Sequence, residues 1–552
     1  MTYSFVNLTP AQLEERRRQL NLAGFQAWLT PIILLVTICL YRRLLKSAIS
    51  MSAKSTSLNS LQILVRRTSW FLHTTYLPEF GPLHIQLSSL LYFSWLLYLI
   101  FRATGNDYMH LTKSFGHVAV SQLPIHYLLS TKSTYSPITL ATGLTHERLN
   151  AYHRLFGRMI HVLLVAHAIL YIRFFMQMNV LEKRLGDRDV RLGIAAFWTL
   201  NFLGILSLPS IRRKIYHKVF YRSHALLSIL FLPIVFFHVP YTRFYVVQAG
   251  VIWFLSGFMR MKTSAKAQAR CEKIHGTKLV SVRFDADKKS NLGLAHAAPG
   301  QHVYVHRTGK DPKTPFTIAS LRPADTDVVG GLQVQLVARN TGGPQTSWLE
   351  AMATNESQIE LLIEGPYGEA SNYMPSLLEA VDQPVLLIAG GVGATYTLPI
   401  YSALVSSRRG GATAIGKGKG KIKMVWMVRT PADAAWGIEI LNYLHDVDLD
   451  VDVYITTPST DMDIHADTKG PSKKEEDEGI RIHRLGRRPK LMPLIDNFFS
   501  SISSPPSSSA AVLLCGPSSL SRDAHKAVGN HVLKSQGTRV EWFEEVFGFG
   551  GS

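Results

Sequence analysis

Cysteine is nearly absent from this chain of 552 residues, which contains only Cys39, Cys271 and Cys515. Three cysteines exclude a disulfide-built scaffold and a zinc or iron–sulfur site made of cysteines. Charged residues are also scarce, at 18% against about 25% in an average soluble protein, and hydrophobic residues make up 47%. This composition excludes disorder, collagen and coiled coil, and it indicates a chain that is part membrane-embedded and part globular.

Acidic residues are fewer than basic ones, with 39 Asp and Glu against 59 Lys and Arg, which gives a net charge of +20. Such a charge is typical of nucleic-acid binding, but no domain-sized basic stripe is present in the sequence. Basic residues also collect at the cytoplasmic flanks of membrane spans. We therefore expect a lipid membrane, and no nucleic acid, as a partner.

Long hydrophobic runs occur only before about residue 262. A membrane helix needs roughly 20 apolar residues, and runs near this length predict seven spans. These lie at 23–41, 83–101, 114–131, 150–174, 192–209, 218–239 and 243–260. We expect an N-terminal segment with a first span at 1–80 and a six-helix bundle at 81–262.

The orientation in the membrane follows from the second half of the chain, which lacks a disulfide framework and so is expected in the cytosol. Seven spans then place the N-terminus outside. The basic loops at 42–67 and 212–218 fall inside, as the positive-inside rule requires. Arg16–Arg18 and the basic loop at 183–188 fall outside and disagree with the rule.

Four histidines lie inside predicted spans, where an ionisable residue is costly and marks a function. His153 and His167 share one span, His224 and His238 share another, and each pair is fourteen residues apart. Fourteen residues make about four helical turns, so the two histidines of a pair lie on one face, about 21 Å apart along the axis. One span separates the two helices, which therefore run in the same direction and bring His153 level with His224.

Two stacked pairs of this kind are what two bis-imidazole haems require, because two opposed imidazoles fill both axial positions of an iron and favour electron transfer. We predict that these four histidines are axial haem ligands. A proton relay is the alternative. His117, His126, His161 and His217 are interpreted as hydrogen-bonded interior or interface residues.

Three arginines, Arg154, Arg158 and Arg222, lie near the pair formed by His153 and His224. Their guanidinium groups suit haem propionates, or they extend to the lipid head groups. Both interpretations stay open.

The region 263–370 predicts a small antiparallel β-barrel, because short strand-like runs follow one another in it. The strings PGQHVYVH, TPFTIAS and VARNTGGPQTSWL lie in this region. Arg339 offers a planar donor fork for a phosphate, and Thr346 offers a hydroxyl. Gly342 and Gly343 let backbone amides approach a pyrophosphate closely.

The region 371–552 predicts an α/β nucleotide-binding domain. The string VLLIAGGVGATYTLPIYSAL gives a strand, a turn with Gly390, Gly391 and Gly393, and a helix. Such a turn places backbone amides and a helix N-terminus against a phosphate. Surface loops are expected at 408–421, 458–479 and 500–509, because their Gly, Ser, Pro and charge content cannot bury a core.

Two later strands of this region end in residues that suit a nucleotide. Arg429 follows one strand and can hold the 2′-phosphate of NADP, or it is a solvated charge at a strand end. Cys515 and Gly516 end another strand, and open α/β sheets bind ligands at the carboxyl ends of their strands. Cys515 can instead be a packed core residue.

From about residue 80 to 552, the sequence resembles the ferric reductase and NADPH oxidase superfamily, above all the fungal plasma-membrane ferric/cupric reductases of the flavocytochrome b type. The resemblance is carried by the two histidine pairs, HRLFGR, PGQHVYV, PFTIAS, EGPYG, AGGVGATYTLP, LCGP and the tail WFEEVFGFGGS. It implies a transmembrane α-helical haem bundle, then an antiparallel β-barrel that binds FAD and an α/β domain that binds NADPH, as in ferredoxin reductases.

The resemblance also implies residues that contact the flavin. In this family the PFT residues, here Pro315, Phe316 and Thr317, contact the flavin. The family usually has a histidine before them, and this chain has Thr314. The flavin therefore loses one expected contact.

The nucleotide residues follow from the same resemblance. The Gly-rich turn, with Thr395, and the Cys-Gly-Pro strand, with Cys515, hold NADPH in this family. A near-terminal aromatic residue covers the flavin ring, and here Phe549 takes that place, with Phe547 as the alternative. Cys515 and Phe549 are thereby implied as catalytic residues, although the residues at 550–552 follow the aromatic residue here.

The implied function is an NADPH-dependent ferric-chelate reductase of the plasma membrane that also accepts cupric ion and supports iron and copper uptake. Electrons would pass from cytosolic NADPH through FAD to an inner haem b (His153, His224), an outer haem b (His167, His238) and an extracellular metal. A superoxide-generating NADPH oxidase with the same cofactors is the alternative. A non-enzymatic membrane haem protein is a third reading, which the intact nucleotide half disfavours.

Overall fold

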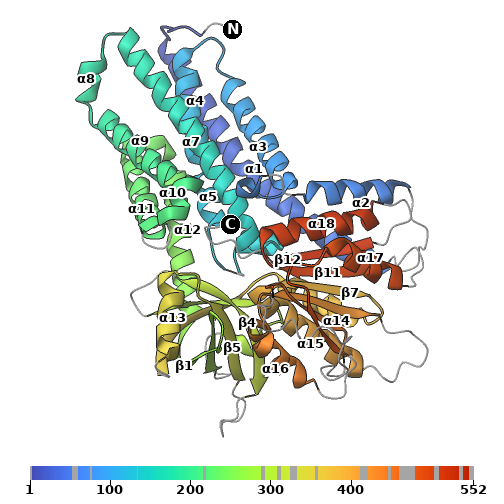
Figure 1. Cartoon of the computed structure of the whole chain (residues 1–552). Coiled ribbons are helices and arrows are strands. Elements are labelled where there is room, and N and C mark those ends of the chain that lie inside the picture. The colour runs from blue at the N-terminus through green and yellow to red at the C-terminus, as the bar shows by residue number, and fades with distance from the viewer. Residues whose placement is uncertain are drawn as a thin grey trace. The chain divides into compact units, whose positions relative to one another are not determined.

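The structure is a computed structural model, and its chain forms two compact units (Figure 1). The first contains Met1–Ser55 and Leu72–Lys262, and the second contains Thr56–Phe71 and Thr263–Ser552. The residues described are 3–51, 60–74, 77–133, 135–215, 219–286, 293–307, 313–323, 332–354, 358–410, 420–444, 449–458, 479–502, 509–533 and 539–545.

The first unit is helical, and six of its helices are long and apolar enough to cross a membrane within the described part of the chain. They are α1 (Pro10–Met51), α3 (Leu83–Phe101), α7 (His146–Gln177), α9 (Arg188–Ser207), α11 (Tyr221–His238) and α12 (Arg243–Lys262), the last preceded by the turn η3 (Pro240–Thr242). Shorter helices are η1 (Pro78–Phe80), α4 (Tyr108–Ser121), α5 (Leu123–Leu129), α6 (Pro137–Thr142), α8 (Leu181–Leu185) and α10 (Pro209–Ile215). Helix α1 contains the first predicted span.

The predicted span at 114–131 is two helices rather than one, because α4 and α5 meet at Gln122. Pro124 cannot continue the hydrogen-bond ladder of a preceding helix and begins a new one at its first turn. The Gln122 side chain is fully buried, with Oε1 accepting from Tyr92 Oη at 2.6 Å and Nε2 donating to Ser121 Oγ at 3.0 Å. The polar groups at the break are thereby satisfied without water.

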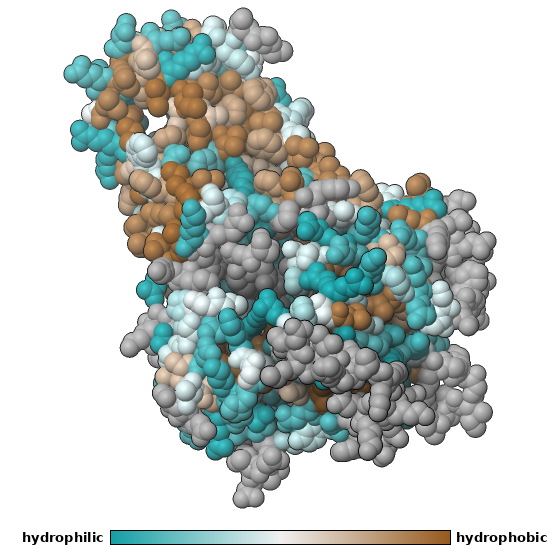
Figure 2. All heavy atoms as spheres, in the orientation of Figure 1, coloured by the Kyte–Doolittle hydropathy of each residue, from teal (hydrophilic) through white to brown (hydrophobic). Residues whose placement is uncertain are grey.

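Large apolar side chains cover the outside of the helical unit, which is mostly brown in Figure 2. Leu91, Val162, Trp198, Phe202 and Phe254 are each more than half exposed, and Leu91 reaches 75%. Soluble monomers rarely expose contiguous apolar surface on this scale, whereas lipid solvates it. The protein is a multi-pass membrane protein.

The first half of the second unit is a closed barrel of six antiparallel strands, as the sequence predicts. The strands are β1 (Ser264–Lys273), β2 (Leu279–Ala286), β3 (His302–His306), β4 (Thr314–Pro323), β5 (Leu332–Arg339) and β6 (Gln358–Tyr367), in the order β1-β2-β5-β4-β3-β6. Inward residues such as Val282, Phe284, Leu336 and Leu361 form its core. Helix α13 (Pro344–Thr354) follows β5 directly.

The second half is a parallel six-stranded sheet with helices, which confirms the predicted α/β domain. Its strands are β7 (Val385–Gly390), β8 (Ile422–Val428), β9 (Val451–Ile455), β10 (Ile480–Arg484), β11 (Ser509–Cys515) and β12 (Arg539–Glu545). Its helices are α14 (Ala370–Glu379), α15 (Ala394–Gly410), α16 (Ala435–Asn442), α17 (Leu491–Ser501) and α18 (Ser518–Val532). The strand order β10-β9-β8-β7-β11-β12 reverses direction between β7 and β11, and ligands of such sheets bind at this switch point.

A segment from the N-terminal part of the chain also belongs to this second unit. Helix α2 (Ser60–Leu72) brings Trp70 to α18, where the indole stacks on His525 with ring centres 4.2 Å apart. The predicted surface loops fall largely in 411–419, 459–478 and 503–508, outside the described residues.

Candidate cofactor sites

The inner predicted histidine pair is brought together by α7 and α11. Helix α9 packs against both, and the rings of His153 and His224 have centres 6.4 Å apart. Two metal–imidazole bonds of about 2 Å each, with the half-widths of the rings added, put the centres of two axial imidazoles roughly 6 Å apart. The observed separation therefore fits two ligands of one haem iron.

All four predicted ligands are hydrogen-bonded through the same ring nitrogen, Nδ1. The acceptors are His126 O for His153 (3.2 Å), Thr112 O for His167 (2.8 Å), Ser207 Oγ for His224 (3.3 Å) and Asp189 O for His238 (2.7 Å). A hydrogen bond from Nδ1–H to an oxygen fixes the tautomer of the ring. It leaves the lone pair of Nε2 available for a metal, as in metal-binding histidines. The residues present fit two haem groups.

A glycine faces the ring of each outer ligand from a neighbouring helix. A Cβ added at Gly116 would lie 2.7 Å from His167 Cε1, and one at Gly193 would lie 2.8 Å from His238 Cε1. Only glycine at these two positions leaves the imidazoles where they are.

Three arginines converge on one carboxylate in the helical unit. Glu79, in η1, accepts from Arg158 NH2 at 2.9 Å and from Arg212 NH2 at 2.9 Å, and its carbonyl accepts from Arg154 Nε at 3.1 Å. Burial works to raise the pKa of Glu79, but the bonds from Arg158 and Arg212 and the charge of Arg154 outweigh it and lower the pKa. One ionised carboxylate against three guanidinium groups leaves a positive surplus next to His153, which suits the two propionates of a haem.

At the switch point of the parallel sheet, the backbone of the Gly-rich turn after β7 lies against the backbone that follows β11. A Cβ at Gly393 would lie 2.4 Å from Cys515 O, and one at Gly390 would lie 2.9 Å from Pro517 Cδ and 3.5 Å from Gly516 Cα. The Gly-rich turn after β7 and the Cys-Gly-Pro segment after β11 therefore form one surface at the carboxyl ends of their strands. Their positions match a phosphate- and nicotinamide-binding crevice.

Arg339 belongs to the barrel, and its side chain lies beside the Gly-rich turn of this crevice. It ends β5, and its NH1 would be 3.9 Å from a Cβ at Gly391, whose φ is +57°. Trp426 Nε1 donates to Gly391 O at 2.9 Å and holds the turn from β8. The predicted flavin-phosphate residue and the predicted NADPH turn are thus neighbours.

The segment between β5 and α13 is organised by Asn340. Its Oδ1 accepts from Gly342 N at 2.8 Å and from the hydroxyl of Thr346 at 3.2 Å, and the Thr346 hydroxyl also donates to Gly343 O at 3.2 Å. Gly342 has a φ of +81° and open space around it. Gln345 is buried, and its amide has no hydrogen-bond partner within the described residues, so this turn keeps a buried polar group for a ligand.

The remaining residues predicted to contact the flavin lie on β4. Pro315 and Phe316 pair with Tyr304 and Val303 of β3, and Phe316 is half-buried against the barrel core. Thr317 is buried.

The Cys515 thiol at the end of β11 is buried. Burial raises its pKa, and the charges of Glu545 and Glu544 act in the same direction. A thiol that burial keeps protonated is a poor nucleophile. Arg429 is exposed after β8, Thr395 Oγ1 donates to Val392 O at 2.9 Å, and Phe547 and Phe549 lie outside the described residues.

Comparison with known families covers both units. Residues 115–235 match "Ferric reductase like transmembrane component", residues 264–371 match "FAD-binding domain" and residues 383–529 match "Ferric reductase NAD binding domain". The chain belongs to the ferric reductase family. It is a multi-pass membrane oxidoreductase with an FAD-binding and an NAD(P)-binding domain, built for electron transfer of the ferric reductase kind.

Relatives in the ferric reductase family are distant and fungal. "Probable metalloreductase AIM14" of Meyerozyma guilliermondii is 24% identical over 441 residues, 77% of this chain and 81% of its own length. "Probable cell surface ferric reductase kap2" of Aspergillus oryzae is 27% identical, over 60% of this chain and 45% of its own. "Ferric/cupric reductase transmembrane component 7" of Saccharomyces cerevisiae is 25% identical, over 62% and 55%. This chain thus spans about half the length of the last two relatives.

Among solved structures, a flavohemoglobin from Malassezia yamatoensis with bound FAD and heme has a TM-score of 0.36 at 14% identity, over 81% of this chain and 98% of its own. A ferredoxin-NADP+ reductase from Plasmodium falciparum has a TM-score of 0.31 at 12% identity, over 51% and 97%.

Three residues of the cofactor sites were not predicted from the sequence. His126 stacks on His153 with ring centres 4.2 Å apart, Arg212 binds Glu79, and Asn340 holds the turn before α13. The N-T-G-G string was a signal for Asn340, since Asn often bonds the backbone two residues on. His126 and Arg212 gave no such signal, because they reach their partners only through the packing of α5 and α10. His217 lies outside the described residues.

Proposed function

We propose that this ferric reductase family protein is a transmembrane NADPH-dependent ferric-chelate reductase of the plasma membrane that also reduces cupric ion. Its two haem groups are held by His153 with His224 and by His167 with His238. The observation that carries the proposal is the common anchoring of these four rings through Nδ1, at two levels of the same two helices. The names of the curated relatives supply the metal substrates.

Residues of the sheet-containing unit bind and orient the nucleotides. Backbone amides at Gly391 and Gly393 receive a pyrophosphate at the start of α15, where the helix dipole adds positive potential. Arg429 receives the 2′-phosphate that distinguishes NADPH from NADH. Arg339 lies between the two nucleotide sites and holds the phosphate of the flavin. FAD, when bound, supplies the exchange between two-electron nicotinamide chemistry and one-electron haem chemistry.

The histidines restrict what the membrane unit can do. A haem held by two imidazoles would supply one-electron transfer rather than binding of a gas. The hydrogen bond on each Nδ1 raises the basicity of the ligating Nε2 and stabilises the oxidised metal. Helices α7 and α11 would therefore hold two one-electron groups, on histidines that are about 21 Å apart along each helix axis.

The order of the two sites follows from the path of the chain. Helices α11 and α12 pack against each other and are joined by the short turn η3, so they run antiparallel. His238 lies at the end with this turn, and His224 lies at the other end, where α12 passes into β1 through Thr263. The pair of His153 and His224 therefore lies at the end of the bundle where the chain leaves α12 for β1.

The test is a direct measurement on the purified full-length chain. We expect two b-type haems per chain in a pyridine haemochrome assay, and one FAD. NADPH oxidation is then followed with ferric EDTA, cupric salt or oxygen as the only acceptor. Faster turnover with the metals supports the proposal, whereas superoxide as the main product, or fewer than two haems, rejects it.

A further inference from the structure

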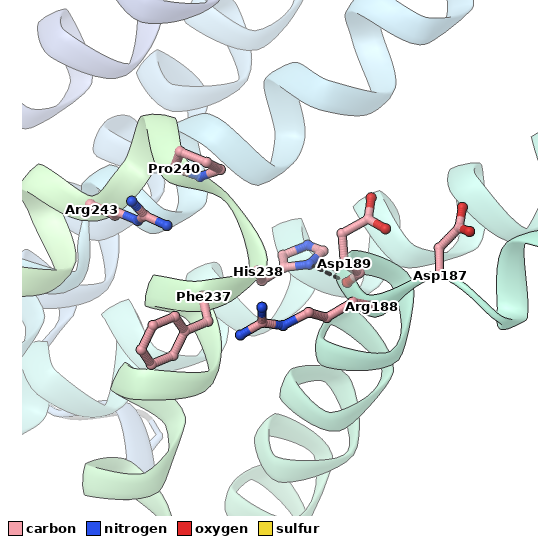
Figure 3. Close-up of a pocket in the computed structure, with 7 residues that line it drawn as sticks. All are labelled: Asp187, Arg188, Asp189, Phe237, His238, Pro240 and Arg243. Atoms are coloured by element: carbon pink, nitrogen blue, oxygen red, sulfur yellow. Dashed lines mark hydrogen bonds between the residues drawn. The ribbon is translucent and has the colours of Figure 1, made fainter.

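A pocket of about 480 Å³ opens at the end of the bundle that carries His238. The beginning of α9, the end of α11 and the turn into α12 form its walls (Figure 3). The His238 ring lines it and is only partly buried, held by the bond from Nδ1 to Asp189 O at 2.7 Å. Part of a proposed haem ligand is thus open to a molecule that enters from this end.

Two guanidinium groups are directed into this pocket. Arg188 extends back along the wall toward the Phe237 ring, 6.0 Å from its centre, and Arg243 lies over the Phe236 ring at 4.8 Å and donates to Phe236 O. In Figure 3 both guanidinium groups lie on the side of His238 that faces away from Asp187. Neither arginine makes an ion pair within the described part of the chain.

The carboxylates at the pocket do not balance these charges. Asp187 is paired with Arg184, which leaves only Asp189 against Arg188 and Arg243. No group of three or more His, Cys, Asp or Glu side chains able to hold a metal ion is found among the described residues. The pocket therefore has the chemistry of an anion site and not that of a bare-cation site.

We propose that this pocket is the acceptor site and that it takes ferric ion as an anionic carboxylate chelate, which Arg188 and Arg243 bind. The inference rests on the proposed function. Guanidinium groups match carboxylates through paired N–H donors. The chelated Fe(III) gains one electron from the protein and leaves as chelated Fe(II), and no bond is broken and no proton moves.

The experiment distinguishes binding of the ferric chelate in the pocket from electron transfer through the protein to any acceptor. The full-length protein is reduced anaerobically with NADPH and mixed in a stopped-flow instrument with ferric EDTA, an anion, or with hexaammineruthenium(III), a cation. Arg188→Ala and Arg243→Ala should each slow reoxidation by ferric EDTA about tenfold and flatten its dependence on salt. Reoxidation by the ruthenium complex should be unchanged or faster. Arg191→Ala is the control, because Arg191 lies about one turn further along α9 and outside the pocket, and its side chain donates to Leu185 O.

Haem content and midpoint potentials of the variants are measured alongside. Equal slowing with both acceptors, or no slowing with ferric EDTA, overturns the acceptor site. A wild-type protein that reduces no ferric chelate overturns the proposed function instead, so the two failures are distinct.

Discussion

The contacts around the predicted haem ligands are specific at the level of single atoms. Three of the four Nδ1 acceptors are main-chain carbonyls, so they belong to the fold and not to a side chain that substitution can remove. The rings of the two outer ligands, His167 and His238, are in addition faced closely by glycines on neighbouring helices. Main-chain carbonyls and glycines, which have no reactive side chain, therefore help to orient the Nε2 atoms that are proposed to bind iron.

Gly116→Ala should displace His167 and cost the protein its outer haem. Alanine in a helix interior is otherwise favourable by about 1 kcal/mol over glycine, so any loss reflects the close approach of the new Cβ to the ring. The haem-to-FAD ratio of the purified protein measures it. Gly204→Ala is the matched control, because its Cβ would lie 2.5 Å from His161, a histidine without a ligand role. Equal haem loss in both variants would contradict the assignment of His167.

Arg429→Ala should raise the KM for NADPH at least tenfold and leave the KM for NADH nearly unchanged. One charge-assisted bond to a 2′-phosphate contributes about 1.5–3 kcal/mol, and only NADPH carries this group. Steady-state turnover with both nucleotides measures the difference. Arg484→Ala, at the end of the edge strand β10, is the control and should change neither KM. A parallel loss with both nucleotides would show that Arg429 has a structural role.

At the scale of elements, a buried carboxylate holds three strands of the parallel sheet together. Asp452 of β9 bonds Lys423 Nζ of β8 at 2.8 Å and Arg481 Nε of β10 at 2.7 Å, and His483 Nε2 lies 3.1 Å away. Burial acts to raise the pKa of Asp452, but these hydrogen bonds outweigh it and lower the pKa. This edge of the sheet therefore depends on one ionised side chain.

Asp452→Asn should destabilise the β8–β10 edge by about 2–4 kcal/mol, because it leaves the largely buried ammonium group of Lys423 without its counter-charge. Hydrogen exchange of the β9 and β10 amides in the full-length protein measures the change. Asp285→Asn on β2, where the carboxylate is exposed, is the control. Since the folded pKa is depressed, the contribution of Asp452 is complete above the unfolded value of about 3.9 and fades as the pH falls toward the folded pKa. Amide protection at β9 that is insensitive to both the substitution and acid would rule out this role.

At the scale of the whole molecule, the two histidine pairs are ordered along one chain that runs from membrane helices to nucleotide domains. The chain path gives the order, because α12 leads directly into β1. Removal of a ligand from either pair should therefore stop electrons at a different point.

His224→Leu should leave NADPH able to bleach the flavin absorbance while haem reduction and ferric EDTA reduction cease. His238→Leu should retain reduction of the inner haem and lose only the transfer to ferric EDTA. Stopped-flow absorbance of flavin and haem measures both. His161→Leu, on α7 but outside the pairs, should keep all three signals. If His238→Leu blocks the inner haem while its haem is retained, the order of the pairs is reversed.

The sequence by itself determined the fold class of the molecule, and it located the candidate site residues. Apolar runs near twenty residues cannot be stable in water, so α1, α3, α7, α9, α11 and α12 were predictable. The alternation and turn residues after residue 262 specified the barrel and the parallel sheet. The equal spacing of fourteen residues on two helices predicted that His153 lies beside His224, because helix periodicity is fixed by backbone geometry.

Only the tertiary structure decided the features that depend on packing between distant segments. The break between α4 and α5 at Gln122 was read from the sequence as one span, because apolar composition does not show where a buried glutamine finds Tyr92. The stacking of His126 on His153 and the binding of Arg212 to Glu79 likewise need helices far apart in sequence to meet. Local periodicity carries no information on such contacts, since they arise from side-chain shape and charge once the helices are assembled.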